Sequence, residues 1–200
     1  MRTVDSIAAL EALYDNPSPL SLTKVARSLT PLYREWIGAA RFCILSTVGP
    51  DGTDASPRGD DGPVVRIIDD KTLWLPDWRG NNRLDCLRNI VADGRVSLLF
   101  MVAGSSNVVR VNAHAVLTDD PAVTATFEQG GRHPKLVIVI TLSEVYFQCA
   151  KAIMRAGLWS GHAAPADLPT AGQFLKEMDN AFDAESYDLR YPTDAQDRMW

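Results

Sequence analysis

A strand gives way to a helix at Leu75-Pro76-Asp77-Trp78-Arg79-Gly80-Asn81-Asn82-Arg83. The preceding residues 72–75 are β-branched or aromatic and predict a strand. Pro76 and Gly80 then interrupt the extended chain. The fold is therefore expected to turn from sheet to helix within this stretch.

The helix after this junction is predicted from residues 82–90, where leucine and isoleucine recur at helical spacing. Asn81 or Asn82 is placed to be its N-cap. A helix start offers unpaired backbone N–H groups, and Arg83 adds a guanidinium, so a phosphate could bind there. The alternative is an ordinary capped surface helix with a solvated arginine.

Two β-hairpins are predicted on either side of residue 60. Residues 42–48 and 53–57 are joined by Gly49-Pro50-Asp51-Gly52, whose residue types are those of a turn. Residues 64–68 and 72–75 form the second pair. Antiparallel pairing is expected in both.

Three longer strands are predicted downstream. Residues 95–102 are largely apolar, so both faces of that strand are expected to be covered. Residues 108–117 separate into an apolar face and a face that carries Arg110, Asn112 and His114. That polar face suits either solvent or hydrogen bonds to a partner. Residues 136–147 form the longest strand.

Helices are expected at both ends of the chain. Residues 4–14, 22–29 and 31–40 should form an N-terminal cover over 1–40, followed by a barrel over 41–148 and a C-terminal helical segment over 149–200, all within one domain, 1–200. Further helices are expected at 119–127, at 148–159 with its end at Gly157, and at 170–182.

The composition of the chain indicates which class of ligand and which cellular compartment to expect. The 200 residues are 46% hydrophobic and carry a net charge of −5, which argues against nucleic acid as a partner and favours a small molecule. Cys43, Cys86 and Cys149 are too far apart in sequence for a CxxC site or an obvious disulfide framework, so a reducing cytoplasm is expected. The sequence begins without a signal-peptide pattern and contains no apolar run long enough for a membrane span.

Known catalytic motifs are missing from the sequence. It has no GxGxxG, GxxxxGK or GxSxG motif, and its three histidines lack the spacing of zinc ligands, so no metal is expected. The catalytic residues remain unknown. Lys151 and Arg155 lie four apart on one predicted helix face, where a nearby anion or plain solvation would offset their repulsion.

Several of these segments together resemble one family. The chain is similar to the FMN-binding split-barrel proteins related to pyridoxamine 5′-phosphate oxidase over residues 42–159. The resemblance rests on the residues 56–60, 78–83, 87–90, 95–100, 110–112, 149–152 and 158–159.

The resemblance implies an α+β, mainly β fold, a six-stranded antiparallel split barrel that forms a homodimer with two FMN molecules in clefts between subunits. It assigns Pro57, Arg58, Gly59 and Asp60 to the flavin, and Asn81, Asn82 and Arg83 to its phosphate, beside Trp78. It also implies that Arg110 and Asn112 reach in from the partner subunit, and that Lys151, Arg155 and Trp159 close the outer side.

The resemblance says less about the substrate than about the fold and the cofactor. True pyridoxamine phosphate oxidases carry a C-terminal Arg-Leu-x-Pro segment that grips the substrate phosphate, and Leu189-Arg190-Tyr191-Pro192 is only a partial match. The first interpretation is an FMN-dependent oxidoreductase acting on an unidentified small molecule. The alternatives are a non-catalytic flavin carrier or sensor, and the same barrel binding a deazaflavin or haem.

Overall fold

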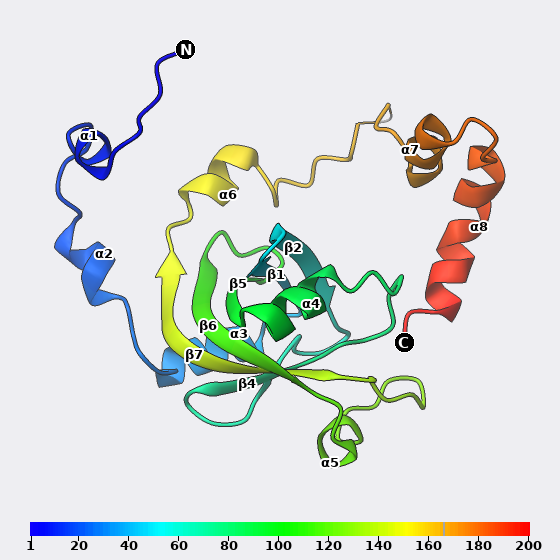
Figure 1. The fold of residues 1–200 in the computed structure, drawn as a ribbon, viewed down its shortest axis with the longest axis horizontal. Helices are drawn as coiled ribbons and strands as arrows, with labels where there is room; N and C mark the ends of the chain where they lie inside the picture. The colour runs from blue at the N-terminus through cyan, green and yellow to red at the C-terminus, as the bar shows by residue number, and fades with distance from the viewer. Residues whose placement is uncertain (166) are drawn as a thin grey trace.

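An antiparallel sheet forms the centre of the protein in the computed structural model, which describes residues 1–165 and 167–200. Its strands are β1 Phe42–Gly49, β2 Gly52–Gly59, β3 Arg66–Ile67, β4 Thr72–Pro76, β5 Arg95–Met101, β6 Val108–Thr118 and β7 Val137–Gln148. The order across the sheet is β2-β1-β5-β6-β7-β4-β3. The long strands β6 and β7 bend strongly, which gives the sheet an open, barrel-like form (Figure 1).

Seven strands are present among the described residues, whereas the family resemblance implied a six-stranded barrel. The shortest is β3, which lies within the predicted strand 64–68, has only two residues and pairs Arg66 with Trp74. Both predicted hairpins are confirmed, because β1 pairs with β2 and β3 pairs with β4, each antiparallel.

Side chains alternate between the two faces of each strand, and those on the inner face form the core. In β6 the side chains of Val109, Val111 and Ala115 are buried, whereas Arg110 and Asn112 on the other face are partly exposed. The predicted division of this strand into two faces is confirmed. Helices α3 (Pro31–Gly38) and α4 (Asp85–Ala92) contribute Ile37, Leu87 and Ile90 to the same core.

Strand β5 differs from its prediction. Its buried residues are Val96, Leu98 and Phe100, while the alternate positions are only partly buried or exposed. The expectation that both faces are covered was wrong for this chain, because one face of β5 packs on the core and the other remains accessible.

The N-terminal cover was also predicted too broadly. Helix α3 begins after Thr30, whose hydroxyl accepts a hydrogen bond from Tyr33 N, as expected. Helices α1 (Ile7–Glu11) and α2 (Pro19–Thr23) contribute no residue to the described core and extend away from the sheet (Figure 1). The predicted helix at 22–29 was wrong beyond residue 23, because Ala26 pairs instead as an isolated bridge with Val145.

The C-terminal segment contains one helix more than predicted. Its helices are α6 (Lys151–Ala156), α7 (Ala171–Met178) and α8 (Ala184–Asp197), while residue 166 of the predicted segment lies outside the described residues. Helix α6 ends at Gly157 in the left-handed conformation, as predicted. Helix α8 was missed because it is polar and contains Pro192. The short helix α5 (Pro121–Thr124) begins after Asp120 but stops before the predicted end at residue 127.

Across 1–165 and 167–200, no helix is both long and apolar enough to cross a membrane. Over the same ranges, His, Cys, Asp and Glu side chains form no cluster of three or more that could hold a metal ion.

Candidate functional site

The loop between β4 and α4 does not form the helix cap that was predicted. Asn81 uses its Oδ1 to accept a hydrogen bond from Arg83 N at 3.0 Å, and Asn82 adopts a left-handed backbone with φ of 60°. A residue in that conformation cannot continue an α-helix, so α4 starts only at Asp85. Its N-cap residue is Leu84, which has no side chain that could accept from the first turn.

The opening of α4 borders a cavity of about 1600 Å³. Its walls come from the end of β2, the loop after β4, the first turn of α4, the loop after α5 and the C-terminal tail. Small-molecule sites usually occupy roughly 300–1,000 Å³, so this cavity can hold a cofactor together with a second molecule. All eight predicted residues from the segment 57–60 at the end of β2 and from the β4–α4 loop line it: Pro57, Arg58, Gly59, Asp60, Trp78, Asn81, Asn82 and Arg83.

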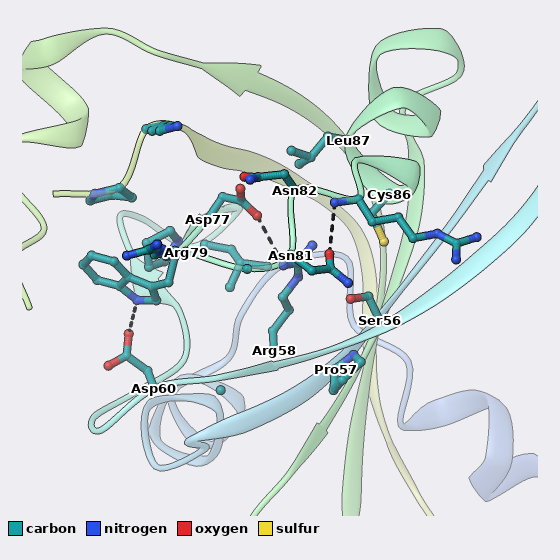
Figure 2. Close-up of a pocket in the computed structure, with 18 of the residues that line it drawn as sticks. Ser56, Pro57, Arg58, Asp60, Asp77, Arg79, Asn81, Asn82, Cys86 and Leu87 are labelled. Carbon is teal, nitrogen blue, oxygen red and sulfur yellow. Dashed lines mark hydrogen bonds and ion pairs between the residues drawn. The ribbon is translucent and has the colours of Figure 1, made fainter. Parts of the chain in front are cut away.

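Arg58 and Asp77 form an ion pair inside this cavity. Arg58 Nη1 lies 3.2 Å from Asp77 Oδ1, and Figure 2 shows the Asp77 carboxylate directed at the arginine. The Nε of Arg58 is buried and has no hydrogen-bond partner among the described residues. An unpaired buried donor is costly, and a bound acceptor would remove that cost.

Asp60 connects the two loops that frame the cavity. Its Oδ2 accepts a hydrogen bond from Trp78 Nε1 at 2.7 Å, and its Oδ1 accepts one from Gln129 Nε2 at 2.9 Å. The indole of Trp78 is thereby held next to the end of β2. Asp60 therefore acts as a support for the wall, whatever it contacts in a bound ligand.

Arg83 lies at the outer part of the cavity. Its Nε is 2.5 Å from Asp85 Oδ2, and its side chain is 79% exposed. The hydrogen bond that Arg83 donates to Asp85 raises the pKa of Arg83, so this guanidinium stays charged. A phosphate at the start of α4 would meet this cation beside free backbone N–H groups.

The other five predicted residues do not line the cavity of a single chain. Arg110 lies over the ring of Tyr146 at 5.6 Å, and Asn112 Nδ2 donates to Glu144 Oε1 at 2.8 Å. Trp159 Nε1 donates to Ser105 O at 2.7 Å, and Trp159 borders a separate hollow of about 300 Å³. Lys151 and Arg155 are exposed on α6.

Several residues of the cavity were not selected from the sequence. Asp77 belongs to the quoted junction but carried no recognisable motif, while Arg132, Tyr191 and Trp200 come from segments far away in sequence. Cys86 also lines the cavity; its Sγ lies 2.7 Å from Asp54 Oδ2, and burial raises the pKa of Cys86 to about 11. This thiol is therefore protonated at neutral pH and is a poor nucleophile.

The protein is an open, barrel-like antiparallel sheet with a cavity at a strand-to-helix junction, and arginine, aspartate and aromatic side chains line that cavity. The family model described as pyridoxamine 5′-phosphate oxidase matches residues 29–149, more than half of the chain, and the protein belongs to this family. The match covers α3, α4, α5 and the entire sheet. The predicted family is thus confirmed.

Solved structures of similar fold have low sequence identity to the chain. HupZ of Group A Streptococcus is 18% identical, with 58% of this chain and 91% of the HupZ chain covered at a TM-score of 0.48. An FMN-binding protein from Syntrophomonas wolfei is 14% identical, with 65% and 91% covered at a TM-score of 0.43. A protein described as F420 reductase is 16% identical, with 60% and 98% covered at a TM-score of 0.44. The comparison with curated protein sequences finds no match.

Proposed function

We propose that the cavity binds FMN and that the protein is an FMN-dependent oxidoreductase acting on a small molecule. The observation that carries this proposal is the buried Arg58 Nε, which lacks a partner among the described residues in a cavity also bordered by Arg83 and the uncapped start of α4. The family match supports a cofactor of this kind.

The residues of the cavity fit the two chemically different parts of FMN. The phosphate needs cations and N–H donors, which Arg83 and the first turn of α4 supply. The isoalloxazine ring needs a hydrogen-bonding wall, which Arg58 and the backbone of 57–60 supply, with the indole of Trp78 on the same wall. Together these residues would bind the ring, orient it and exclude water from it.

The cofactor would supply the redox chemistry, which is the transfer of a hydride or of single electrons. The chain's contribution is electrostatic. Arg58 places a fixed positive charge in the cavity, and Asp77 partly balances it at 3.2 Å. Because both side chains are largely shielded from water, their charges act strongly on a ring bound beside them.

Five proposed ligands of FMN require a second subunit or a different conformation. Arg110, Asn112, Lys151, Arg155 and Trp159 do not line the described cavity. Arg110 and Asn112 lie on the polar face of β6, which is partly exposed and directed away from the core. We propose that a homodimer carries this face into the cavity of the partner subunit.

A spectrum of the purified protein tests the proposal. Bound flavin gives a yellow protein, and the mass of the ligand released by denaturation distinguishes FMN from a deazaflavin or haem. Reduction of the bound flavin by a nicotinamide cofactor would then separate an oxidoreductase from a flavin carrier or sensor. A colourless protein that also fails to take up FMN on titration would contradict the proposal.

A further inference from the structure

The C-terminal tail returns to the cavity and is held there by its last residue. The indole of Trp200 packs edge-on against that of Trp78, with ring centroids 5.4 Å apart and planes at 79°. Arg132 Nη1 donates to the main-chain oxygen of Trp200 at 2.5 Å. Tyr191, Met199 and Trp200 all line the cavity, so the tail forms part of its wall.

Helices α7 and α8 form a hairpin with its own internal contacts. Asp188 on α8 accepts hydrogen bonds from Gly172 N at 2.8 Å and from the hydroxyl of Thr170. A Cβ at Gly172 would lie 2.5 Å from Ala184 O, which shows how closely the two helices approach. Thr170 and Gln173 complete a capping box at the start of α7. The two helices are therefore held together as one unit by their own contacts.

The outer surface of this hairpin is exposed. Leu189 on α8 and Met178 on α7 keep 81% and 79% of their surface. Figure 1 shows the two helices set apart from the sheet. After α8 the chain reaches the cavity wall through Met199 and Trp200. Contacts near residue 200 thus contribute strongly to keeping the hairpin against the barrel.

We propose that the α7–α8 hairpin is a movable wall of the FMN cavity and that Trp200 latches it shut, which controls the entry and release of flavin. This inference rests on the proposed function. When Trp200 lies on Trp78, the outer side of the cavity is closed. When it leaves, the hairpin swings away as a body and opens the cavity.

Stopped-flow flavin fluorescence tests the latch in three variants. Trp200→Ala should raise both the association and the dissociation rate of FMN about tenfold, because one edge-to-face aromatic pair and its buried area are lost. Trp200→Phe should retain most of the wild-type behaviour. Leu189→Ala, on the same hairpin but not in the cavity wall, is the matched control and should leave both rates unchanged.

The association rate separates a latch from an ordinary contact. A residue that only contacts bound FMN changes dissociation alone, so an unchanged association rate in Trp200→Ala would overturn the proposal. An equal effect of Leu189→Ala would overturn it as well.

A second measurement on the FMN-free protein keeps the test independent of the cofactor. Trp200→Ala should accelerate amide hydrogen exchange in residues 77–84 and 130–135 severalfold, and Leu189→Ala should not. If wild-type protein takes up no FMN, the proposed function fails, and this exchange result alone decides whether the latch exists. Unchanged exchange in Trp200→Ala rejects the latch.

Discussion

The guanidinium of Arg58 lies 3.2 Å from the carboxylate of Asp77, and the two side chains keep only 21% and 20% of their surface exposed. Burial nevertheless raises the pKa of Asp77, because lost hydration outweighs the attraction of Arg58. The ionised carboxylate is therefore held in the folded protein at a net cost. Such a cost is tolerable at a binding site, where the pair shapes the charge that a ligand meets.

The raised pKa of Asp77 predicts an unusual pH dependence of stability. The Asp77 contribution is fully present below the unfolded-state pKa of 3.8 and is lost as pH rises through the higher folded-state pKa. In Asp77→Asn this loss cannot occur. The free energy of unfolding of the variant, relative to wild type, should therefore increase as pH rises from 3.8 toward neutrality, as measured by urea denaturation of the FMN-free protein.

A carboxyl whose pKa is lowered in the folded protein provides the control for this measurement. Hydrogen bonds from Arg95 lower the pKa of Asp93 to about 2, so its contribution is present above 3.8 and is lost as pH falls toward 2. Asp93→Asn should therefore show the reverse slope. The exchange of the protonated carboxyl for a neutral amide in Asp77→Asn adds an offset that does not change with pH, whereas the attraction of Arg58 is already contained in the folded-state pKa, so the slope is the informative quantity. If the free energy of unfolding of Asp77→Asn changes with pH as that of wild type does, the raised pKa assigned to Asp77 is contradicted.

Arg83→Ala should weaken FMN binding by roughly ten- to a hundredfold, because a hydrogen bond to a charged group contributes about 1.5–3 kcal/mol. Riboflavin lacks the phosphate and should bind variant and wild type almost equally. Arg88→Ala removes an exposed cation from helix α4, just after the loop that contains Arg83 and outside the cavity, and serves as the control. Equal losses of riboflavin and FMN would show that Arg83 has a structural role.

Arg110→Ala should lower FMN affinity and leave the fold of the single chain intact, because in the proposed dimer this side chain enters the partner's cavity. FMN and dimerisation should then reinforce each other by mass action. Sedimentation of FMN-free and FMN-loaded protein over a range of concentrations measures this linkage. A monomer that retains stoichiometric FMN on dilution would place the whole site within one chain.

Gly49→Ala should destabilise the protein by about 1–3 kcal/mol through overpacking. A Cβ at this position would lie 2.1 Å from Asn89 Oδ1, and Asn89 donates to the buried Thr47 Oγ1 at 3.0 Å. Gly38→Ala is the matched control, since a Cβ there meets open space at the end of α3. Equal unfolding midpoints for the two variants would show that Asn89 moves aside without cost.

Pyridoxamine phosphate should be a poor substrate. Arg190 of the partial Arg-Leu-x-Pro match lies within α8 and donates its Nε to Ser186 O at 3.1 Å rather than lining the cavity. Oxidation of this compound by the FMN-loaded protein can be followed as aldehyde formation. Turnover of about 1–10³ per second, which is ordinary for enzymes, would contradict this expectation.

The sequence predicted those features that depend on local chemistry. Alternation placed Val109 and Val111 in the core, and turn residues located the hairpin of β1 and β2. The cap of α4 was wrong because the left-handed Asn82 postpones the helix, and a single asparagine can equally form a turn or a cap.

The site was predictable only in part, because some of its residues come from local motifs and others are brought in by tertiary contacts. Arg58, Trp78 and Arg83 come from continuous motifs and line the cavity, while their contacts with a cofactor stay a prediction. Arg132 and Trp200 reach the cavity through tertiary contacts that no local pattern encodes. The assignment of Arg110 to a partner subunit stays a prediction.

The topology also bears on the order of folding. Strands β5, β6 and β7 form a meander of neighbouring segments, whereas β1 and β4 join its two sides by pairings between segments distant in sequence. Such pairings form slowly, because chain entropy is lost before contacts are gained. Arg58 lies on the strand that follows β1, and Asp77 directly follows β4, so their contact depends on both of these slow pairings. We therefore expect the contact to be absent from the transition state for folding. Substitutions at either residue should then act on the unfolding rate and leave the folding rate nearly unchanged.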